Sequence, residues 1–118
     1  EMEKVNSNDA SLIQLLSRED RPTAFVVSED MLALALERAC NKLHLSIPDD
    51  ISIIAFNNSL YSELAAPQLT AVDINSYQLG QEAAMQIINY LENPNLRPTK
   101  IIVPHKIVPR NSCKRIDV

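Results

Sequence analysis

The stretch that decides the fold is residues 45–58, LSIPDDISIIAFNN. A solvated turn at Pro48-Asp49-Asp50 opens it, an apolar run over residues 51–56 follows, and two asparagines close it. A short apolar run without polar alternation is typical of a strand buried on both faces of a parallel sheet. The stretch therefore predicts an interior strand that leads into a polar loop.

Strands and helices alternate on both sides of this stretch. Residues 23–27 and 69–74 are further apolar runs, and we expect the strand at 23–27 to be buried on both faces as well. Four helices are expected. The first is capped by Ser7-Asn8-Asp9 and ended by Arg21-Pro22, and the second, over residues 32–43, is capped by Ser28-Glu29-Asp30. A short third covers residues 60–65, and a long fourth starts at Asn75-Ser76 and ends at Asn93-Pro94.

The end of the chain is expected to be less regular. Residues 101–108 are rich in β-formers, but Pro104 interrupts them, which predicts a bent or edge strand. We expect the tail over residues 111–118 to be frayed. Taken together, the pattern predicts an α/β fold with a mainly parallel sheet and helices on both faces.

In such a sheet, right-handed crossovers bring the carboxyl ends of all strands to one edge, where ligands bind. Polar residues follow each strand there, and the predicted ligand-binding residues are Glu29, Asp30, Asn57, Asn75 and Ser76. Carboxylate, amide and hydroxyl groups together offer the donors and acceptors that a polyhydroxyl ligand needs.

Each of these residues also has a purely structural explanation. Asn57 can form an Asx turn, acidic residues in a first helical turn are favoured by the helix dipole, and Asn75 and Ser76 can cap a helix.

Composition excludes several classes of function. The net charge is −4 and the basic clusters are short, so any DNA-binding surface lies outside this chain. His44 and His105 lie on different expected elements, and Gly80 is the only glycine, so neither a metal site, a catalytic pair nor a phosphate-binding loop is expected. We therefore expect neither enzymatic activity nor a cofactor.

The cellular location follows from cysteine usage and hydropathy. Cys40 and Cys113 show no disulfide or metal-ligand spacing, and no apolar run has the length of a membrane span. We expect a cytoplasmic protein without a membrane partner. Because the chain opens abruptly at Glu1-Met2-Glu3, we also expect it to be a piece of a longer protein.

Several motifs resemble the LacI/GalR family of transcriptional regulators by their order and spacing, from about Arg21 to Cys113. They are Arg-Pro-Thr-Ala at 21–24, Asp30 with Ala33, Leu-Ser-Ile-Pro-Asp-Asp-Ile-Ser at 45–52, Ala-Phe-Asn-Asn at 55–58, Pro-Gln-Leu-Thr at 67–70, Leu79-Gly80 with Ala83-Ala84, and Pro-Arg-Asn-Ser at 109–112.

The resemblance implies a two-lobed core of the periplasmic-binding-protein type I fold. Residues 1–74 would belong to the C-terminal lobe, residues 75–100 to the N-terminal lobe, and residues 101–118 would return to the C-terminal lobe. It also implies a homodimer, operator DNA bound only through a head absent from this chain, and a small-molecule effector, expected to be a sugar. The implied dimer interface comprises Leu34, Arg38, Leu60 and Leu64, for which packing onto the sheet is the alternative.

Two positions depart from the family pattern. Glu29-Asp30 stands where the family commonly has Asn-Asp, and Asn57 stands where a first aspartate often contacts effector. An amide both donates and accepts, whereas a carboxylate only accepts, so the effector can differ from that of relatives.

The resulting expectation is the effector-sensing and dimerisation core of a LacI-type repressor, nearest in pattern to maltose-operon repressors. The alternatives are a sugar-binding component of a transporter with the same fold and a sugar enzyme of the doubly wound class. A helix-turn-helix upstream would favour the repressor, and a secretion signal would favour the transporter.

Overall fold

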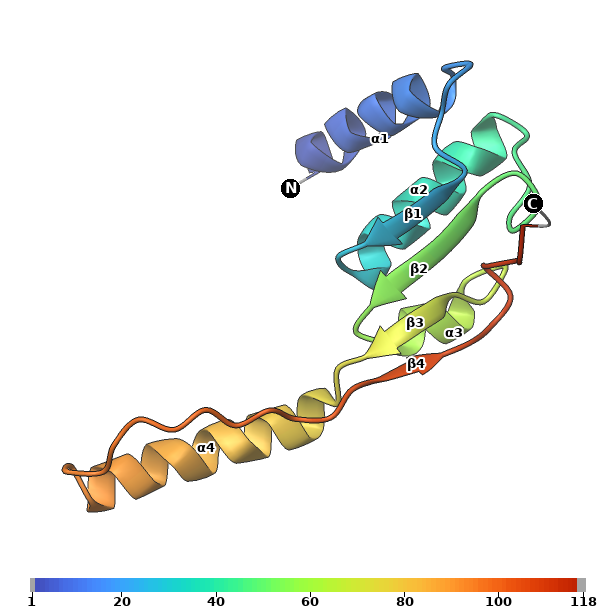
Figure 1. Ribbon diagram of the computed structural model, residues 1–118. Helices are drawn as coiled ribbons and strands as arrows, with labels where there is room; N and C mark the ends of the chain where they lie inside the picture. The colour runs from blue at the N-terminus through green and yellow to red at the C-terminus, as the bar shows by residue number, and fades with distance from the viewer. Residues whose placement is uncertain (1, 117–118) are drawn as a thin grey trace.

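The computed structural model describes the backbone of residues 2–116 and the side chains of residues 9–116. Helices and strands alternate along the chain, as the apolar pattern predicts (Figure 1). The elements are α1 (Met2–Leu16), β1 (Ala24–Val27), α2 (Asp30–Lys42), β2 (Ser52–Phe56), α3 (Leu60–Leu64), β3 (Thr70–Asp73), α4 (Ser76–Glu92) and β4 (Lys106–Val108).

The four strands form one sheet in the order β1-β2-β3-β4. The strands β1, β2 and β3 run parallel, with Val27 beside Ala55 and Phe56 beside Val72. The prediction of a mainly parallel α/β sheet is therefore confirmed. Strand β4 pairs antiparallel with β3 and begins after Pro104, so the proline removes no hydrogen-bond donor from the ladder.

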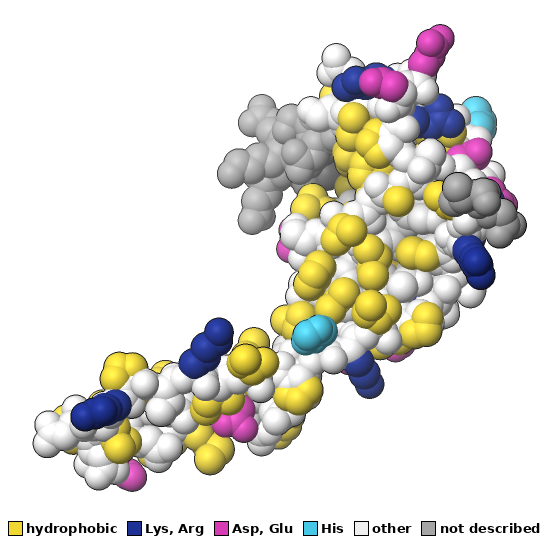
Figure 2. All heavy atoms as spheres, viewed as in Figure 1, with side chains coloured by type: hydrophobic (Ala, Val, Ile, Leu, Met, Phe, Trp, Pro, Cys, Tyr) yellow, Lys and Arg dark blue, Asp and Glu magenta, His cyan; other side chains and the backbone are white. Residues whose placement is uncertain are grey.

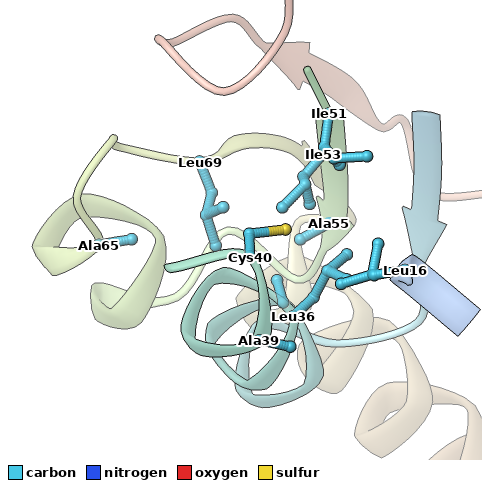
Figure 3. Close-up of a cluster of buried hydrophobic side chains, with 10 residues drawn as sticks. Leu16, Leu36, Ala39, Cys40, Ile51, Ile53, Ala55, Ala65 and Leu69 are labelled. Carbon is cyan, nitrogen blue, oxygen red and sulfur yellow. The ribbon is translucent and has the colours of Figure 1, made fainter. Parts of the chain in front are cut away.

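The hydrophobic core lies between the sheet and helix α2. Ile53 and Ala55 of β2 are fully buried on this side, where Leu36 and Cys40 of α2 meet them (Figure 3). Leu16 at the end of α1 joins the same cluster, and α1 packs against α2. Cys40 is thus a small buried hydrophobic side chain, as its place on the helix predicts.

The opposite face of the sheet has no helix over it within residues 2–116, so these residues form only one of the two helical layers that the sequence predicts. Helices α2 and α3 lie behind the sheet in Figure 1, and apolar side chains gather over its front in Figure 2. Val26 is 75% exposed and Ile107 is 61% exposed on this side. The prediction that residues 23–27 are buried on both faces is therefore wrong for the described chain, because β1 is an edge strand covered on one side only.

Helix α4 and the segment after it extend away from the sheet as an arm (Figure 1). The radius of gyration is 18.6 Å, whereas a compact chain of this length has about 13–14 Å. No residue of α4 is buried. The returning segment is tied to the helix by the Tyr90 hydroxyl, which donates to the Arg97 carbonyl and accepts from the Thr99 N–H, each at 3.1 Å.

The segment around Ser112 completes the sheet. Pairing between β2 and β3 begins at Ile54, which leaves the backbone groups of Ile53 without a neighbour on β3. Ser112 supplies the missing hydrogen-bond partners. Its carbonyl accepts from the Ile53 N–H at 2.8 Å, and its hydroxyl donates to the Ile53 carbonyl. The expectation of a frayed tail is therefore wrong at Ser112, which is fully buried, and residues 117–118 lie outside the described residues.

The predicted caps of α1 and α2 are also corrected. Helix α1 begins at Met2, so Asp9 lies within it and binds Lys42 of α2 at 3.5 Å instead of capping. At the start of α2 the cap position is Glu29, whose side chain makes no capping hydrogen bond. Asp9 thus contacts a neighbouring helix in place of the capping role that the sequence predicts, and Glu29 leaves the start of α2 without a side-chain cap.

Candidate functional site

The candidate site is the sheet edge at which β1, β2 and β3 all end. The arrowheads of these three strands point to the same end of the sheet, and the parallel registers agree (Figure 1). The loops over residues 28–30, 57–58 and 75–76 therefore follow three adjacent strands at one edge. Hydrogen bonds between side chains and backbone link these loops to one another.

Asp30 joins the loop after β1 to the loop after β2. Its side chain is 3% exposed, and its two carboxylate oxygens accept from the Ser59 N–H and the Ser62 hydroxyl, each at 2.8 Å. Because both oxygens are used inside the protein, Asp30 holds the two loops together and presents no carboxylate at the surface.

Glu29, the neighbouring residue, is exposed at the same edge. Its backbone is extended at the cap position of α2, and its carbonyl accepts from the Ala33 N–H at 3.2 Å. Its side chain makes no capping hydrogen bond, so the helix dipole is the structural explanation that remains for this residue. The carboxylate of Glu29 therefore lies where a ligand could reach it.

Asn57 and Asn58 turn the chain after β2. Their φ angles are 89° and 51°, in the left-handed region that asparagine tolerates better than most residues. The Asn57 N–H donates to the Val72 carbonyl at 3.0 Å, which leaves the exposed side chain of Asn57 at the edge. The half-buried amide of Asn58 donates to Asp73 Oδ2 at 3.2 Å and so connects this loop to β3.

Asp73, at the end of β3, organises the crossover to α4. Its Oδ1 accepts from the Asn75 N–H at 2.8 Å. This backbone hydrogen bond, together with the amide of Asn58 and the charge of Lys106, holds the pKa of the Asp73 carboxyl below its usual value. Asp73 is therefore an anion that fixes both the loop after β2 and the start of the arm.

Asn75 and Ser76 begin the arm. Asn75 has a φ of 53°, and its amide donates to Gln78 Oε1 at 2.8 Å rather than capping α4. Ser76 is exposed at the first position of the helix. The capping explanation therefore fails for the side chain of Asn75, which points along the helix surface beside the sheet edge.

Two hollows lie next to this crossover. One of about 240 Å³ is lined by Asp73, Asn75, Pro104, His105 and Lys106. A second of about 530 Å³ is apolar and is lined by Phe56, Val72, Ile74, Leu79, Val103, His105 and Ile107. Small-molecule sites commonly combine an apolar wall with a few polar groups in about 300–1,000 Å³, so the pair has a suitable character.

Asn58, Asp73 and Arg110 are absent from the predicted ligand-binding residues, although they organise the edge. Arg110 donates to Asn58 Oδ1 at 2.7 Å across 52 positions of sequence. No local spacing signals a contact of this range. The only available signal was that Asn58 and Arg110 both lie within motifs shared with the resembled family.

The residues predicted for a dimer interface lie on α2 and α3. Leu60 is 66% exposed and Leu64 is 70% exposed, so neither packs onto the sheet. Arg38 is exposed and lies 3.8 Å from Asp9 of α1, whereas Leu34 is half-buried against the core. The alternative of packing onto the core thus applies to Leu34 and not to the two leucines of α3.

Glu37 is a buried carboxyl away from the edge. It is 6% exposed, and within the described residues its Oε1 has no hydrogen-bond partner. Burial raises the pKa of Glu37 to about 7, although the Ala66 N–H, which donates to the carboxylate, opposes this rise. Glu37 packs beneath the end of α3 and contributes nothing to the candidate site.

The described part of the chain offers neither a metal-binding cluster nor a membrane-spanning helix. No group of three or more His, Cys, Asp or Glu residues in it is placed to hold a metal ion. None of its helices has the length and apolar character needed to cross a membrane.

Comparisons with known proteins identify the fold family. The profile of the periplasmic binding protein-like domain matches residues 1–113. Catabolite control protein A of Priestia megaterium is 32% identical over 101 residues, which cover 86% of this chain and 30% of that protein. The chain therefore spans about 30% of the length of this relative.

Solved structures agree. A structure from Bacillus cereus subsp. cytotoxis NVH 391-98, described as a LacI transcriptional regulator, is 37% identical with a TM-score of 0.87 over 93% of this chain and 39% of that one. A LacI family transcriptional regulator from Enterococcus faecium with bound ribose is 26% identical with a TM-score of 0.80 over 92% of this chain and 40% of that one. The chain thus belongs to the periplasmic binding protein-like domain family, and its similarity to LacI-family regulators extends over almost its whole length.

Proposed function

We propose that the chain is part of the sugar-sensing, dimer-forming core of a LacI-type transcriptional repressor, whose operator-binding head lies elsewhere in a longer cytoplasmic protein. The observation that carries the proposal is the hydrogen-bonded linkage of three polar loops at one sheet edge, through Asp30, Asn58 and Asp73. The ribose bound to the Enterococcus faecium relative supports a sugar as the class of effector.

The proposed ligand contacts are the exposed side chains of Glu29, Asn57 and Ser76 and the half-buried side chain of Asn75. Glu29 would accept hydrogen bonds from hydroxyls, and Asn57, Asn75 and Ser76 would both donate and accept. Asp30 takes a positioning role in this proposal, because its carboxylate is occupied by Ser59 and Ser62. Enzymatic activity and a cofactor form no part of the proposal, which is a binding function throughout.

The arm supports a division between two lobes. We assign residues 1–74 and 101–118 to the C-terminal lobe and residues 75–100 to the N-terminal lobe. The absence of buried residues on α4 supports this assignment, since the helix makes no core with the sheet. An effector held between the lobes would favour one arrangement over the other and so change the spacing of two operator-binding heads.

The proposed dimer interface is the outer surface of α2 and α3. Leu60 and Leu64 present apolar side chains there, and Arg38 lies on the neighbouring helix. A second copy of the chain would bury the two leucines in a two-fold contact. Leu60→Glu with Leu64→Glu is expected to convert the dimer to monomers in sedimentation, whereas Ile116→Glu, on the exposed tail, serves as a control and should not.

Calorimetric titration of the intact regulator tests the binding function. Maltose, ribose and further mono- and disaccharides form the panel, with adenine and guanine as ligands of another class. Asn57→Ala is expected to weaken binding of the recognised sugar about tenfold, as the loss of one ligand hydrogen bond does. Asn41→Ala, an exposed asparagine on α2, is the matched control. Unchanged affinity in Asn57→Ala contradicts the site, and binding of nucleobases alone contradicts the sugar.

A further inference from the structure

We propose that Arg110 is a positioning residue for the effector edge, which holds the loop after β2 and the crossover to α4 through one chain of hydrogen bonds. The proposal rests on the proposed function in so far as it concerns the effector. The hydrogen-bonded chain itself rests on contacts within the protein.

Arg110 follows the antiparallel strand β4, and its side chain contacts the loop after β2 and the residue just before β3. Its side chain is 11% exposed, and its Nη1 donates to the Leu69 carbonyl at 2.7 Å while Nη2 donates to Asn58 Oδ1 at 2.7 Å. Its backbone N–H also donates to Thr70 Oγ1 at 3.0 Å, which fixes the residue at the start of β3. Hydrogen bonds from a charged donor in a shielded position are among the stronger ones in proteins.

The guanidinium determines how the amide of Asn58 is oriented. Since Arg110 donates to Oδ1, the other end of the amide, Nδ2, is directed to Asp73 Oδ2. Asp73 then accepts from the Asn75 N–H with its second oxygen. One continuous chain of contacts therefore runs from Arg110 through Asn58 and Asp73 to Asn75.

Two members of this chain, Asn58 and Asn75, and the neighbouring Asn57 hold uncommon backbone conformations. Their φ angles lie between 51° and 89°. Such conformations persist where the surrounding contacts over-determine them. The contact from Arg110 supplies one such constraint to Asn58 directly and to Asn75 through Asp73, and Asn57 is the neighbour that we assign to the effector.

The salt bridge to Glu63 is not the reason for the placement of Arg110. Its N–O distance is 3.7 Å, and the Glu63 side chain is 61% exposed, so it is a weak surface pair. The two short hydrogen bonds to Leu69 and Asn58 define the position of the guanidinium instead.

Hydrogen exchange of the intact regulator without ligand tests the chain of contacts. Arg110→Met keeps the length of the side chain and removes its donors, and we expect exchange to become about tenfold faster over residues 57–59 and 73–76. Asn58→Asp keeps an acceptor for Arg110 but places a carboxylate against Asp73, so exchange should become faster over residues 73–76 and stay slow over 57–59. Arg115→Met, on the exposed tail, is the matched control and should change neither.

The same variants are titrated with the sugar from the panel, maltose or ribose among them, that the unaltered regulator binds. Arg110→Met should weaken affinity about tenfold and Arg110→Lys should recover part of it, whereas Ile53→Val, a core variant of lowered stability, should bind normally. Exchange over residues 57–59 equal to that of the Arg115→Met control overturns the proposal, and so does normal affinity in a loosened Arg110→Met protein.

Hydrogen exchange and sugar titration together distinguish failure of the Arg110 proposal from failure of the proposed function. If Arg110→Met does not fold, the opposite exchange behaviour predicted for the two segments in Asn58→Asp still decides the matter. If the unaltered regulator binds no sugar, the proposed function fails, while the exchange result still decides whether Arg110 positions the loop and the crossover.

Discussion

Helix α2, which packs on the sheet, and helix α4, which forms the arm, have similar apolar patterns but differ in how much of them is buried. Helices α2 and α4 both carry an apolar stripe at helical spacing, but α2 buries seven residues and α4 buries none. Ile87, Ile88 and Leu91 of α4 are each more than half exposed. An amphipathic pattern therefore shows which face of a helix needs a partner, but it does not show whether the same chain supplies that partner.

Because of this difference, the sheet with α2 and the arm contribute unequally to the free energy of unfolding. Helices of this length gain most of their stability from packing of the apolar face rather than from intrinsic propensity. Because α4 lacks such packing in this chain, the sheet with α2 accounts for most of the buried apolar area. Substitutions in the two regions should therefore differ in their cost.

The largest contrast is between Ile53 and Ile88. Ile53→Ala removes a fully buried side chain of β2 and is expected to lower the free energy of unfolding of the 118-residue chain by about 3–4 kcal/mol. Ile88→Ala, at a position 54% exposed on α4, should change it by less than about 0.5 kcal/mol. Urea unfolding followed by circular dichroism measures both, and equal losses would show that the arm has a core of its own.

A smaller contrast separates Asp30 from Glu29 at the effector edge. Asp30→Ala leaves the Ser59 N–H and the Ser62 hydroxyl without their acceptor and should cost about 2–3 kcal/mol of stability. Glu29→Ala, one residue earlier and exposed, should leave stability within about 0.5 kcal/mol and weaken sugar binding instead. Unfolding and titration of both variants sharpen the division between holding the edge and contacting the ligand. A strongly destabilised Glu29→Ala protein contradicts that division.

Glu37 predicts how the region around α2 responds to pH. Its pKa is about 7 in the folded protein against 4.5 for an ordinary glutamate, so the native state retains a proton that the unfolded chain releases. Stability should therefore fall as pH rises from about 4.5 to 7. Glu37→Gln should be more stable than the parent by about 1–2 kcal/mol at pH 8 and equal to it at pH 4, whereas the exposed control Glu19→Gln should show no such difference. Urea unfolding at the two pH values measures it, and a pH-independent difference would contradict it.

The smallest effect is expected at the junction between the two regions. Asn75 holds a φ of 53°, so Asn75→Ala should cost about 1 kcal/mol, since an alanine has no compensation for the left-handed conformation. Asn75→Gly should stay within about 0.5 kcal/mol of the parent, because glycine adopts this conformation readily. Thermal unfolding of the pair measures the difference. If alanine were tolerated as well as glycine, the junction would relax without affecting the sheet.

The strands and the edge could be predicted from the sequence. The apolar runs at 23–27, 51–56 and 69–74 contain β1, β2 and β3, and their parallel order places the following loops at one edge. These predictions succeeded because a period-free apolar run and a polar turn are local signals. The features that could be predicted are therefore those that depend on neighbouring residues in the sequence.

The contacts that organise the edge could not be predicted in the same way. Ser112 completes the backbone pairing of Ile53 across 59 positions, and Arg110 binds Asn58 across 52. Neither contact follows from periodicity, since each depends on where β4 returns to the sheet. The exposure of one face of β1 could not be predicted either. Its apolar sequence indicates that both faces need a partner, but it does not show whether the same chain supplies that partner.

The late position of Ser112 in the chain has a consequence for the order of folding. During synthesis β1, β2 and β3 leave the ribosome before the residues that satisfy the backbone of Ile53, and all of α4 must follow before they appear. Contacts so far apart in sequence form late and slowly, because a long loop has to close first. Until the segment around Ser112 arrives, the backbone groups of Ile53 therefore stay unpaired in the nascent sheet, and at this stage the chain most needs protection from other nascent chains.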